Sequence, residues 1–264
     1  MKYFVISDTH SFYTETIKAL NEKGYDQNNP DHTLILCGDA FDRGDESVKM
    51  FEWMKSLPKD RFVYIKGNHE DLLEECYRNI IEGRYIDFHH YSNGTVKTIC
   101  DIISSHELYL PDSDCYNINN VKENVGKVLG FIKERCVDFF ETKHYVFVHG
   151  WIPYQINPYL EYVYDKNWRH PAEYRLWDSR WKNGMEMCHY HNIRVPRKTT
   201  VCGHFHTSWA RKNITGEIEE EFPENRFDKK LMYETFKPYE EEGIIAIDSC
   251  VAYSGFVNCI VLED

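Results

Sequence analysis

Five short runs of β-branched and aromatic residues recur along the chain, and each one stops at a polar side chain. They cover residues 3–7, 33–38, 62–67, 145–148 and 200–203. Runs of this length and composition predict buried β-strands. The polar side chains that follow them are Asp8, Asp39, Asn68, His149 and His204. All five can bind a metal ion, so the strand ends are the first candidates for a functional site.

Segments with apolar residues at helical spacing separate the early strands. Residues 14–21, 46–57 and 71–81 each carry one apolar stripe, such as Val48, Phe51 and Met54, and we expect amphipathic helices there. Alternating strands and helices predict an α/β sheet with crossover connections. In such sheets ligands bind outside the carboxyl ends of the strands, so we expect the polar strand ends to converge at one edge.

Three stretches interrupt this alternation. Residues 83–143, with a helix expected over 121–140, and residues 151–198, rich in Trp, Tyr, His and Arg, are expected to be insertions over the site. Residues 207–243 are strongly charged and are expected to form a surface excursion before late strands over 244–247 and 256–262. We therefore expect a single domain that spans residues 1–264.

The charge and the cysteine content narrow the classes of partner. The chain has 31 Lys and Arg against 43 Asp and Glu, a formal net charge of -12, which disfavours a long nucleic acid as partner. Its 9 cysteines include no C-x-x-C pair, which favours reduced thiols and a cytoplasmic location over a disulfide framework. Because no run of about eighteen apolar residues is present, we expect no membrane partner.

The polar strand ends belong to larger groups of potential metal ligands. Asp8-x-His10 and His204-x-His206 each carry an additional imidazole, and Asp39 lies between them in sequence. Carboxylate, imidazole and amide ligands together suit Mn, Fe or Zn better than an all-oxygen Ca or Mg site. A lone carboxylate between two such groups can bridge two ions. Two divalent ions about 3.5 to 4 Å apart clamp a phosphoryl oxygen and activate water, which predicts hydrolysis by in-line attack.

Five motifs in this order resemble the motif set of the calcineurin-like metallophosphoesterases. They are Asp8-Thr9-His10, Gly38-Asp39-Ala40-Phe41-Asp42-Arg43-Gly44, Gly67-Asn68-His69-Glu70, His149-Gly150 and Gly203-His204-Phe205-His206. The Asp-Arg-Gly variant is similar to the phosphoprotein-phosphatase-like branch, which includes bacterial and phage Ser/Thr phosphatases and symmetrical dinucleoside tetraphosphatases. The resemblance implies a β-sandwich of two mixed sheets flanked by helices, with helical and loop insertions over the site. Ser11 departs from the pattern, since the family usually has glycine there.

The resemblance also implies a ligand set for two divalent metal ions. It places one ion on Asp8, His10 and Asp39, and the other on Asp39, Asn68, His149 and His204. The assignment of His206 stays open, because the phosphatase branch often lacks this histidine whereas other members use it on the first ion. The resemblance favours Mn, with Fe, Zn, Ni or Co as alternatives.

The same resemblance implies which groups handle the phosphate. His69 corresponds to the general acid that protonates the leaving oxygen, and Asp42 to the carboxylate that orients it. Arg43 corresponds to the arginine that holds the phosphate through a bidentate fork, next to Asn68.

The family uses a further phosphate-binding arginine after the position of His149. Arg180, in a segment that resembles that part of the family pattern, is the first candidate, and Arg175 is the alternative. Tyr253 resembles a loop tyrosine near the phosphate, with packing in the core as the competing interpretation. The histidines at 89–90 and 189–191 are interpreted as ordinary loop residues.

The sequence leaves several functions open. The first is a phosphomonoesterase similar to Ser/Thr protein phosphatases, acting on a phosphorylated protein or a small phosphorylated metabolite or nucleotide. A symmetrical dinucleoside polyphosphate hydrolase is the alternative, because the aromatic residues within 151–181 suit base stacking. A phosphodiesterase is disfavoured by the acidic charge. A catalytically silent metal-bound interaction module is disfavoured because all the catalytic positions are filled.

Overall fold

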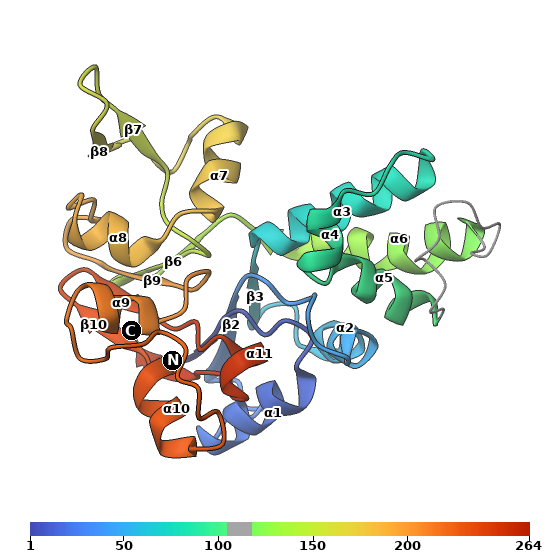
Figure 1. Ribbon diagram of the computed structural model, residues 1–264, viewed down its shortest axis with the longest axis horizontal. Helices are drawn as coiled ribbons and strands as arrows, with labels where there is room; N and C mark the ends of the chain where they lie inside the picture. Colours follow the sequence, from blue (N-terminus) through green and yellow to red (C-terminus); the bar gives the residue numbers. More distant parts are fainter. Residues whose placement is uncertain (105–117) are drawn as a thin grey trace.

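Two β-sheets form the centre of the molecule (Figure 1), in a computed structural model that describes residues 1–104 and 118–264. The first sheet has the strand order β12-β1-β2-β3-β4, with β1 (Lys2–Ile6), β2 (His32–Cys37), β3 (Phe62–Ile65), β4 (Cys136–Val137) and β12 (Ile260–Glu263). The second has the order β10-β11-β9-β6-β5, with β5 (Phe140–Glu141), β6 (Tyr145–Phe147), β9 (Thr199–Cys202), β10 (Tyr239–Glu241) and β11 (Ile244–Ala246).

Both sheets are mixed, as expected. In the first, β1 to β4 pair in parallel while β12 runs antiparallel to β1. In the second, β6, β9 and β11 are parallel, and β5 and β10 are antiparallel edge strands. The expected sandwich of two mixed sheets flanked by helices is therefore confirmed. The five polar strand ends do not share one sheet edge, however, because the strands are divided between two sheets.

Alternation along each strand builds the core between the sheets. Successive side chains of a strand point to opposite faces. In β1, Phe4 and Ile6 pack toward the helices, whereas Val5 packs between the sheets. The layer between the sheets consists of buried side chains from both: Val5, Ile35, Cys37, Ile65, Phe147, Val201 and Ile247. This apolar layer holds the carboxyl ends of the parallel strands of both sheets at a common rim.

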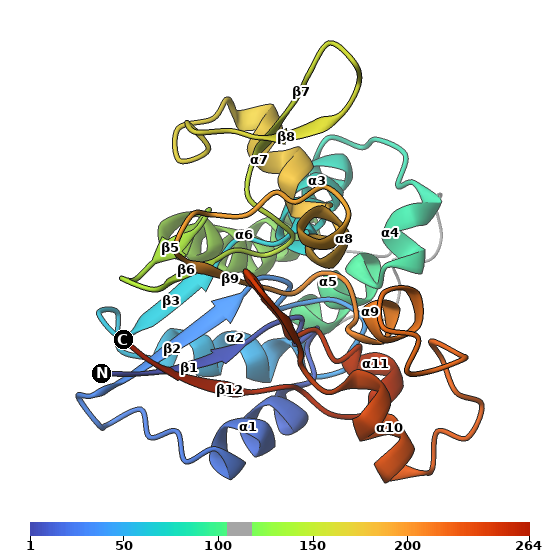
Figure 2. The ribbon, with the colours of Figure 1, turned by 90° about the vertical axis from the view of Figure 1, so that its left-hand side faces the viewer.

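Helices cover the outer face of the first sheet (Figure 2). They are α1 (Tyr13–Glu22), α2 (Ser47–Ser56), α3 (Asn68–Ile81), α5 (Thr95–Ile103) and α6 (Ile118–Arg135), and each contributes buried side chains to one continuous cluster with β1 to β3. The short helix α4 (Phe88–Ser92) connects α3 to α5, and α11 (Val251–Ser254) adds Val251 to the same cluster. The three predicted crossover helices, which are α1 to α3, therefore share the cover of this face with α5 and α6 from the expected insertion over 83–143.

The outer face of the second sheet is covered by residues from the later part of the chain. The hairpin β7 (Tyr154–Ile156) and β8 (Tyr162–Tyr164) leads to α7 (Glu173–Arg180) and α8 (Gly184–His189). Beyond β9 come α9 (Ser208–Asn213) and α10 (Lys229–Phe236). Trp151 and Trp168, both fully buried, fill the cluster between this cover and the sheet. Much of the aromatic content of this segment therefore packs in the core.

Three expected elements have different bounds. The expected helix over 121–140 is wrong at its C-terminal end, because Cys136 and Val137 pair with β3 and Phe140 pairs with Phe147. The excursion over 207–243 holds α9, α10 and β10, and β10 extends the second sheet. The last strand is shorter than expected and begins at Ile260. Within the described ranges, no helix combines the length and apolar character needed to span a bilayer.

Candidate active site

Sharp turns after the strands bring the five polar strand ends together at the rim of the sandwich. Asp8, Asp39 and His204 have φ angles of 50°, 55° and 67°, so the backbone turns through the left-handed region directly after β1, β2 and β9. Backbone hydrogen bonds tie the loops together, since Asp8 N donates to Gly38 O at 3.1 Å and Gly203 N donates to His149 O at 2.8 Å. Loops that are far apart in the sequence thus lie side by side and form one surface.

Asp39 lies at the centre of this surface and faces three imidazoles. Its Oδ2 is 3.3 Å from His149 Nε2 and 3.9 Å from both His10 Nε2 and His69 Nε2. Asn68 Oδ1 is 2.8 Å from the same nitrogen of His149. Asp39 belongs to two groups whose donor atoms lie within 4.8 Å of one another, one with His10 and His69 and the other with His149 and His204. This is the position that a bridging carboxylate requires.

Two of these imidazoles are held in place by backbone carbonyls. His10 Nδ1 lies 2.8 Å from Phe41 O, and His149 Nδ1 lies 2.8 Å from Cys37 O. A carbonyl that accepts the Nδ1 proton orients each ring so that Nε2 faces Asp39, which is the orientation that a metal ion needs. The mixed nitrogen and oxygen donors fit divalent transition-metal ions.

Charges inside the cluster act strongly on one another. Burial and the neighbouring Asp248 raise the pKa of Asp8 well above its usual value. Burial alone would lower the pKa of His149, but the carboxylates of Asp39 and Asp8 raise it to about 10. Burial and His149 lower the pKa of His204 to about 3. Buried carboxylates that raise one another's pKa indicate a place where a cation is favourable.

The carboxylate of Asp8 meets the loop that follows β9 in the second sheet. Its two carboxylate oxygens accept hydrogen bonds from His204 N at 3.1 and 2.9 Å. A Cβ at Gly203 would collide with this carboxylate and with Ser7, which explains the glycine between β9 and His204. The rings of His149 and His204 are 5.1 Å apart.

A second group on the first sheet joins Asp42, His69 and Arg43. His69 Nδ1 lies 2.7 Å from Asp42 Oδ2, and Arg43 Nη2 lies 3.4 Å from His69 Nε2. Although burial opposes it, the carboxylates of Asp39 and Asp42 raise the pKa of His69. An imidazole that is oriented and charged by a carboxylate can donate a proton to a leaving group.

Helix α5 holds Asp42 in place through two of its threonines. Thr95 Oγ1 donates to Asp42 Oδ2 at 2.8 Å, and Asp42 N donates to Thr98 Oγ1 at 3.0 Å. A Cβ at Gly94, which has a φ of 86°, would collide with Arg43 N. The positions of Asp42 and Arg43 therefore depend on the start of α5.

Sequence reasoning missed two buried carboxylates at the rim. Glu70 accepts hydrogen bonds from Gly67 N at 2.6 Å, Asp39 N at 3.1 Å and Ala40 N at 2.9 Å, and so joins the loops after β2 and β3. Asp248 follows β11 and raises the pKa of Asp8. The signal for Asp248 was available, because the expected strand over 244–247 also stops at a carboxylate. Glu70 stands in the motif at residues 67–70, but it follows no strand directly and its neighbours in sequence do not indicate its hydrogen-bond partners.

The remaining predicted residues have other partners. Arg180 donates to Asp71 Oδ2 at 2.7 Å and to Asp138 Oδ1 at 2.6 Å. Arg175 Nη2 lies 2.7 Å from Asp165 Oδ2. Their roles as the second phosphate-binding arginine stay predictions.

Tyr253 and His206 lie against the segment that precedes α10. The hydroxyl of Tyr253 donates to Pro223 O at 2.6 Å, and its ring packs on Phe222 and Phe236. His206 Nδ1 is 2.7 Å from Ser208 Oγ, and its Nε2 is 3.8 Å from Glu221 Oε2. The phosphate-binding role of Tyr253 and the metal-binding role of His206 stay predictions.

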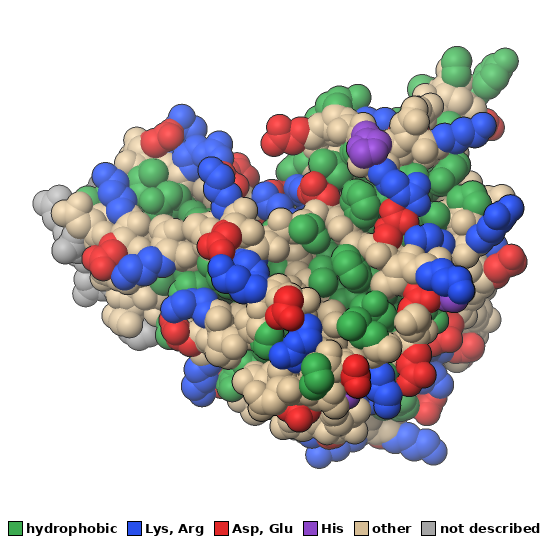
Figure 3. All heavy atoms as spheres, turned by 180° about the vertical axis from the view of Figure 1, so that it is seen from behind, with side chains coloured by type: hydrophobic (Ala, Val, Ile, Leu, Met, Phe, Trp, Pro, Cys, Tyr) green, Lys and Arg blue, Asp and Glu red, His purple; other side chains and the backbone are tan. Residues whose placement is uncertain are grey.

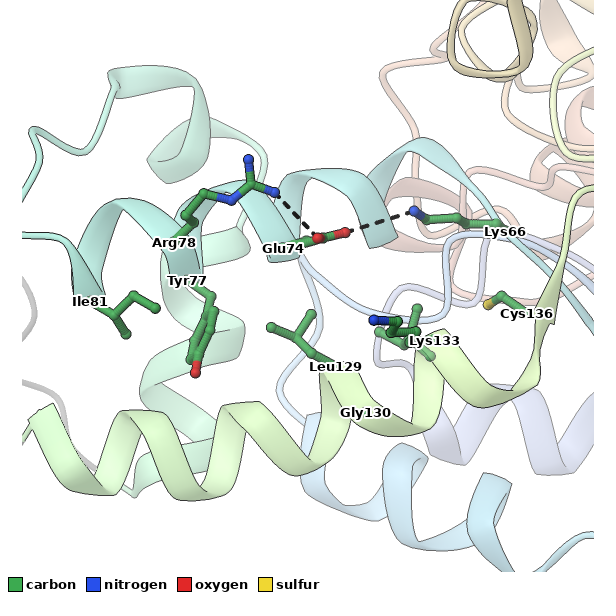
Figure 4. A pocket seen from close by; sticks show the side chains of 10 residues that line it. Lys66, Glu74, Tyr77, Arg78, Ile81, Leu129, Gly130, Lys133 and Cys136 are labelled. Carbon is green, nitrogen blue, oxygen red and sulfur yellow. Dashed lines mark hydrogen bonds and ion pairs between the residues drawn. The ribbon is translucent and has the colours of Figure 1, made fainter. Parts of the chain in front are cut away.

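The surface carries charged side chains of both signs, and a pocket lies away from the predicted metal ligands. Figure 3 shows acidic and basic side chains interspersed over the face opposite to that of Figure 1. A pocket of about 510 Å³ lies between α3 and α6, and its lining includes Tyr77 and Leu129 (Figure 4). Glu74 pairs there with Arg78 at 3.2 Å and with Lys66 at 3.9 Å. No predicted metal ligand lines this pocket.

The sandwich, the shared carboxylate and the carboxylate-oriented imidazole together define a site suited to metal-dependent hydrolysis. The chain belongs to the calcineurin-like phosphoesterase family, whose model matches residues 1–236.

Curated relatives match over short segments. The chain is 36% identical over 76 residues to the asymmetrical bis(5'-nucleosyl)-tetraphosphatase PrpE of Bacillus velezensis, covering 26% of this chain and 30% of the relative. It is 34% identical over 84 residues to the symmetrical bis(5'-nucleosyl)-tetraphosphatase of Buchnera aphidicola, covering 32% of this chain and 30% of the relative. The matched segments thus span less than a third of each relative's length.

Solved structures share the fold. A cold-active protein-tyrosine phosphatase of a psychrophilic Shewanella species superimposes with a TM-score of 0.52 at 15% identity. The superposition covers 100% of this chain and 75% of that structure. At this identity the likeness extends to the fold alone.

Proposed function

We propose that the protein is a metal-dependent phosphomonoesterase that acts on phosphorylated proteins or small phosphorylated metabolites in the cytoplasm. The observation that carries the proposal is the position of Asp39 between two groups of imidazoles, beside the Asp42–His69–Arg43 group. Membership of the calcineurin-like phosphoesterase family supports it.

The buried ligands at the strand ends fit two divalent ions. Asp8, His10 and Asp39 would hold one, and Asp39, Asn68, His149 and His204 the other, with His206 as a further candidate for the first. Mn is the ion we favour, and Fe, Zn, Ni and Co suit the same donors. When bound, such a pair polarises the phosphoryl oxygens and lowers the pKa of a water molecule.

Side chains of the protein would bind the phosphate, donate the proton and hold the loops in position. Arg43 and Asn68 bind the phosphate oxygens, and the guanidinium contributes positive charge on the leaving-group side. His69 donates its proton from Nε2 to the leaving oxygen, because Asp42 holds the opposite nitrogen at 2.7 Å. Glu70 keeps the two ligand-bearing loops at a fixed separation.

A dinucleoside polyphosphate hydrolase is the second candidate. Both curated relatives described above are named as bis(5'-nucleosyl)-tetraphosphatases. The ring of Trp181 lies 6.0 Å from that of His204 and 6.0 Å from that of Trp177. Both indoles are partly exposed, at 36% and 51%, so a base could stack beside the metal ligands.

Substrate preference separates these candidates. With Mn²⁺ added, we expect faster hydrolysis of p-nitrophenyl phosphate than of bis(p-nitrophenyl) phosphate, and loss of both activities on chelation. Faster cleavage of the diester would contradict the phosphomonoesterase proposal. Diadenosine tetraphosphate cleaved far faster than phosphopeptides would establish the second candidate in its place. Metal binding without turnover of any of these substrates would identify a silent module.

A further inference from the structure

A second group of potential metal ligands lies outside the active site, between α3 and α4. Glu75 comes from α3, and His89 and His90 are neighbours in α4. One donor atom from each of the three residues lies within 4.8 Å of the others. The group shares no residue with the two groups around Asp39.

His90 provides the independent sign that something binds here. Its side chain is fully buried, at 0% exposure, and neither ring nitrogen has a hydrogen-bond partner in the described part of the chain. Buried polar atoms in proteins nearly always have a partner, because leaving one without costs free energy. A bound ion would supply that partner to a ring nitrogen of His90, whose donor atom already lies beside those of Glu75 and His89.

His89 is oriented as a ligand by a neighbouring carboxylate. Its Nδ1 lies 3.1 Å from Asp87 Oδ1, and Asp87 also accepts from the backbone nitrogen of His89 at 3.2 Å, capping α4. A carboxylate that holds one imidazole nitrogen leaves the other to bind a metal, an arrangement common behind metal ligands. Asp87 therefore fixes both the start of α4 and the ring of His89.

The chemistry of the three donors indicates which ion fits. Two imidazoles and one carboxylate form a set that Zn²⁺ accepts, with a water molecule in the fourth position. Ca²⁺ and Mg²⁺ prefer sites made of oxygen ligands alone.

We propose that Glu75, His89 and His90 bind a divalent cation, Zn²⁺ by its chemistry, at a site separate from the active site. The ion links α3 to α4. From α4 the chain passes through Gly94 into α5, where Thr95 and Thr98 hold Asp42. A metal at this place stabilises the segment that orients the acid-donating group.

Metal stoichiometry tests the proposal directly. The full-length protein is dialysed against Zn²⁺ and its metal content is measured by elemental analysis. We expect the unaltered protein to bind one more Zn²⁺ per chain than His89→Gln or Glu75→Gln. Both substitutions are at side chains with solvent access, so they test binding without opening the core. Glu74→Gln, one residue earlier on α3, and His170→Gln, at an exposed histidine, are matched controls expected to bind as the unaltered protein does.

Thermal unfolding provides a second readout that does not depend on activity. At a free Zn²⁺ concentration about 100 times the dissociation constant, selective binding to the folded state raises the unfolding midpoint by roughly 5 to 10 °C. We expect this increment to be missing from His89→Gln and Glu75→Gln and present in both controls. Equal stoichiometry and equal midpoint shifts in all five proteins would overturn the proposal. That result would leave the proposed phosphoesterase activity untouched, because neither measurement involves turnover.

Discussion

Replacing Glu70 by glutamine tests whether one buried carboxylate fixes the separation of the loops that follow β2 and β3. Oε2 of Glu70 accepts from Gly67 N at 2.6 Å and from Asp39 N at 3.1 Å. Oε1 accepts from Ala40 N at 2.9 Å and from Tyr64 Oη at 2.7 Å. Glutamine is nearly the same size, so the substitution changes hydrogen bonding and charge while preserving packing.

The magnitude follows from the geometry. Glutamine keeps one acceptor oxygen and places an NH₂ group where the other oxygen was. With the oxygen at the Oε2 position, Ala40 N loses its acceptor, whereas the hydroxyl of Tyr64 can turn and accept. One orphaned buried N–H costs about 1 to 3 kcal/mol, and weakening the bonds to a charged acceptor adds about 1 kcal/mol each. Burial and Asp39 raise the pKa of Glu70, so removing its charge recovers part of this loss. We expect a net destabilisation of about 2 to 4 kcal/mol.

Urea unfolding followed by circular dichroism measures this difference. Glu74→Gln is the matched control, because the side chain is exposed on the same helix and its ion pairs lie at the surface. We expect the control to change the free energy of unfolding by less than about 0.5 kcal/mol. If Glu70→Gln lowers stability no more than the control does, the four hydrogen bonds do not hold the loops and the reasoning is wrong.

Three further substitutions probe other parts of the structure. His69→Asn should retain fold and metal content while kcat falls by about 10² to 10⁴ on substrates with a poor leaving group; steady-state kinetics that show no loss would remove its assigned role. Gly94→Ala should lose about 1 to 3 kcal/mol more than Gly83→Ala, because both glycines have positive φ but only Gly94 meets backbone, that of Arg43, at the Cβ position; equal losses in urea unfolding would contradict this. Burial alone would raise the pKa of Glu46, but hydrogen bonds from Lys49 and Thr14 lower it. The stabilisation by the Glu46 carboxylate is therefore present at neutral pH and lost as the pH falls through its folded-state pKa. The unaltered protein should then exceed Glu46→Gln in free energy of unfolding at neutral pH, and the difference should shrink on acidification. A difference that is constant with pH would argue against the interaction.

The strands and the polar residues that follow them could be predicted from local sequence pattern alone. Each of the five runs is a strand, and the polar residue after each one lies at the rim of the sandwich. This was predictable because a strand's composition and the polar residue that ends it are properties of adjacent positions. The expected helix over 121–140 is wrong at its end because strand pairing with distant residues overrides the local pattern there. The residues over 136–140 are compatible with a helix locally, and only their pairing with β3 and β6 makes them strands.

The roles of Glu70 and Arg180 could not be read in this way. Glu70 matters because its carboxylate meets backbone groups about 30 residues earlier in the chain. Arg180 lies in a segment that resembles a phosphate-binding one, yet its guanidinium meets Asp71 and Asp138. Such partners are set by which elements pack together, and no pattern within either segment specifies them.

The sequence by itself determined the kind of chemistry available, because the polar side chains and their place after buried strands are properties of neighbouring residues. Only the tertiary structure decided that the strands divide into two sheets and that Asp39 stands between two groups of imidazoles. It also placed Glu75 beside His89 and His90. The physical reason is that hydrogen-bond pairing and side-chain packing between distant segments depend on the free energy of the whole assembled core, to which every segment contributes at once.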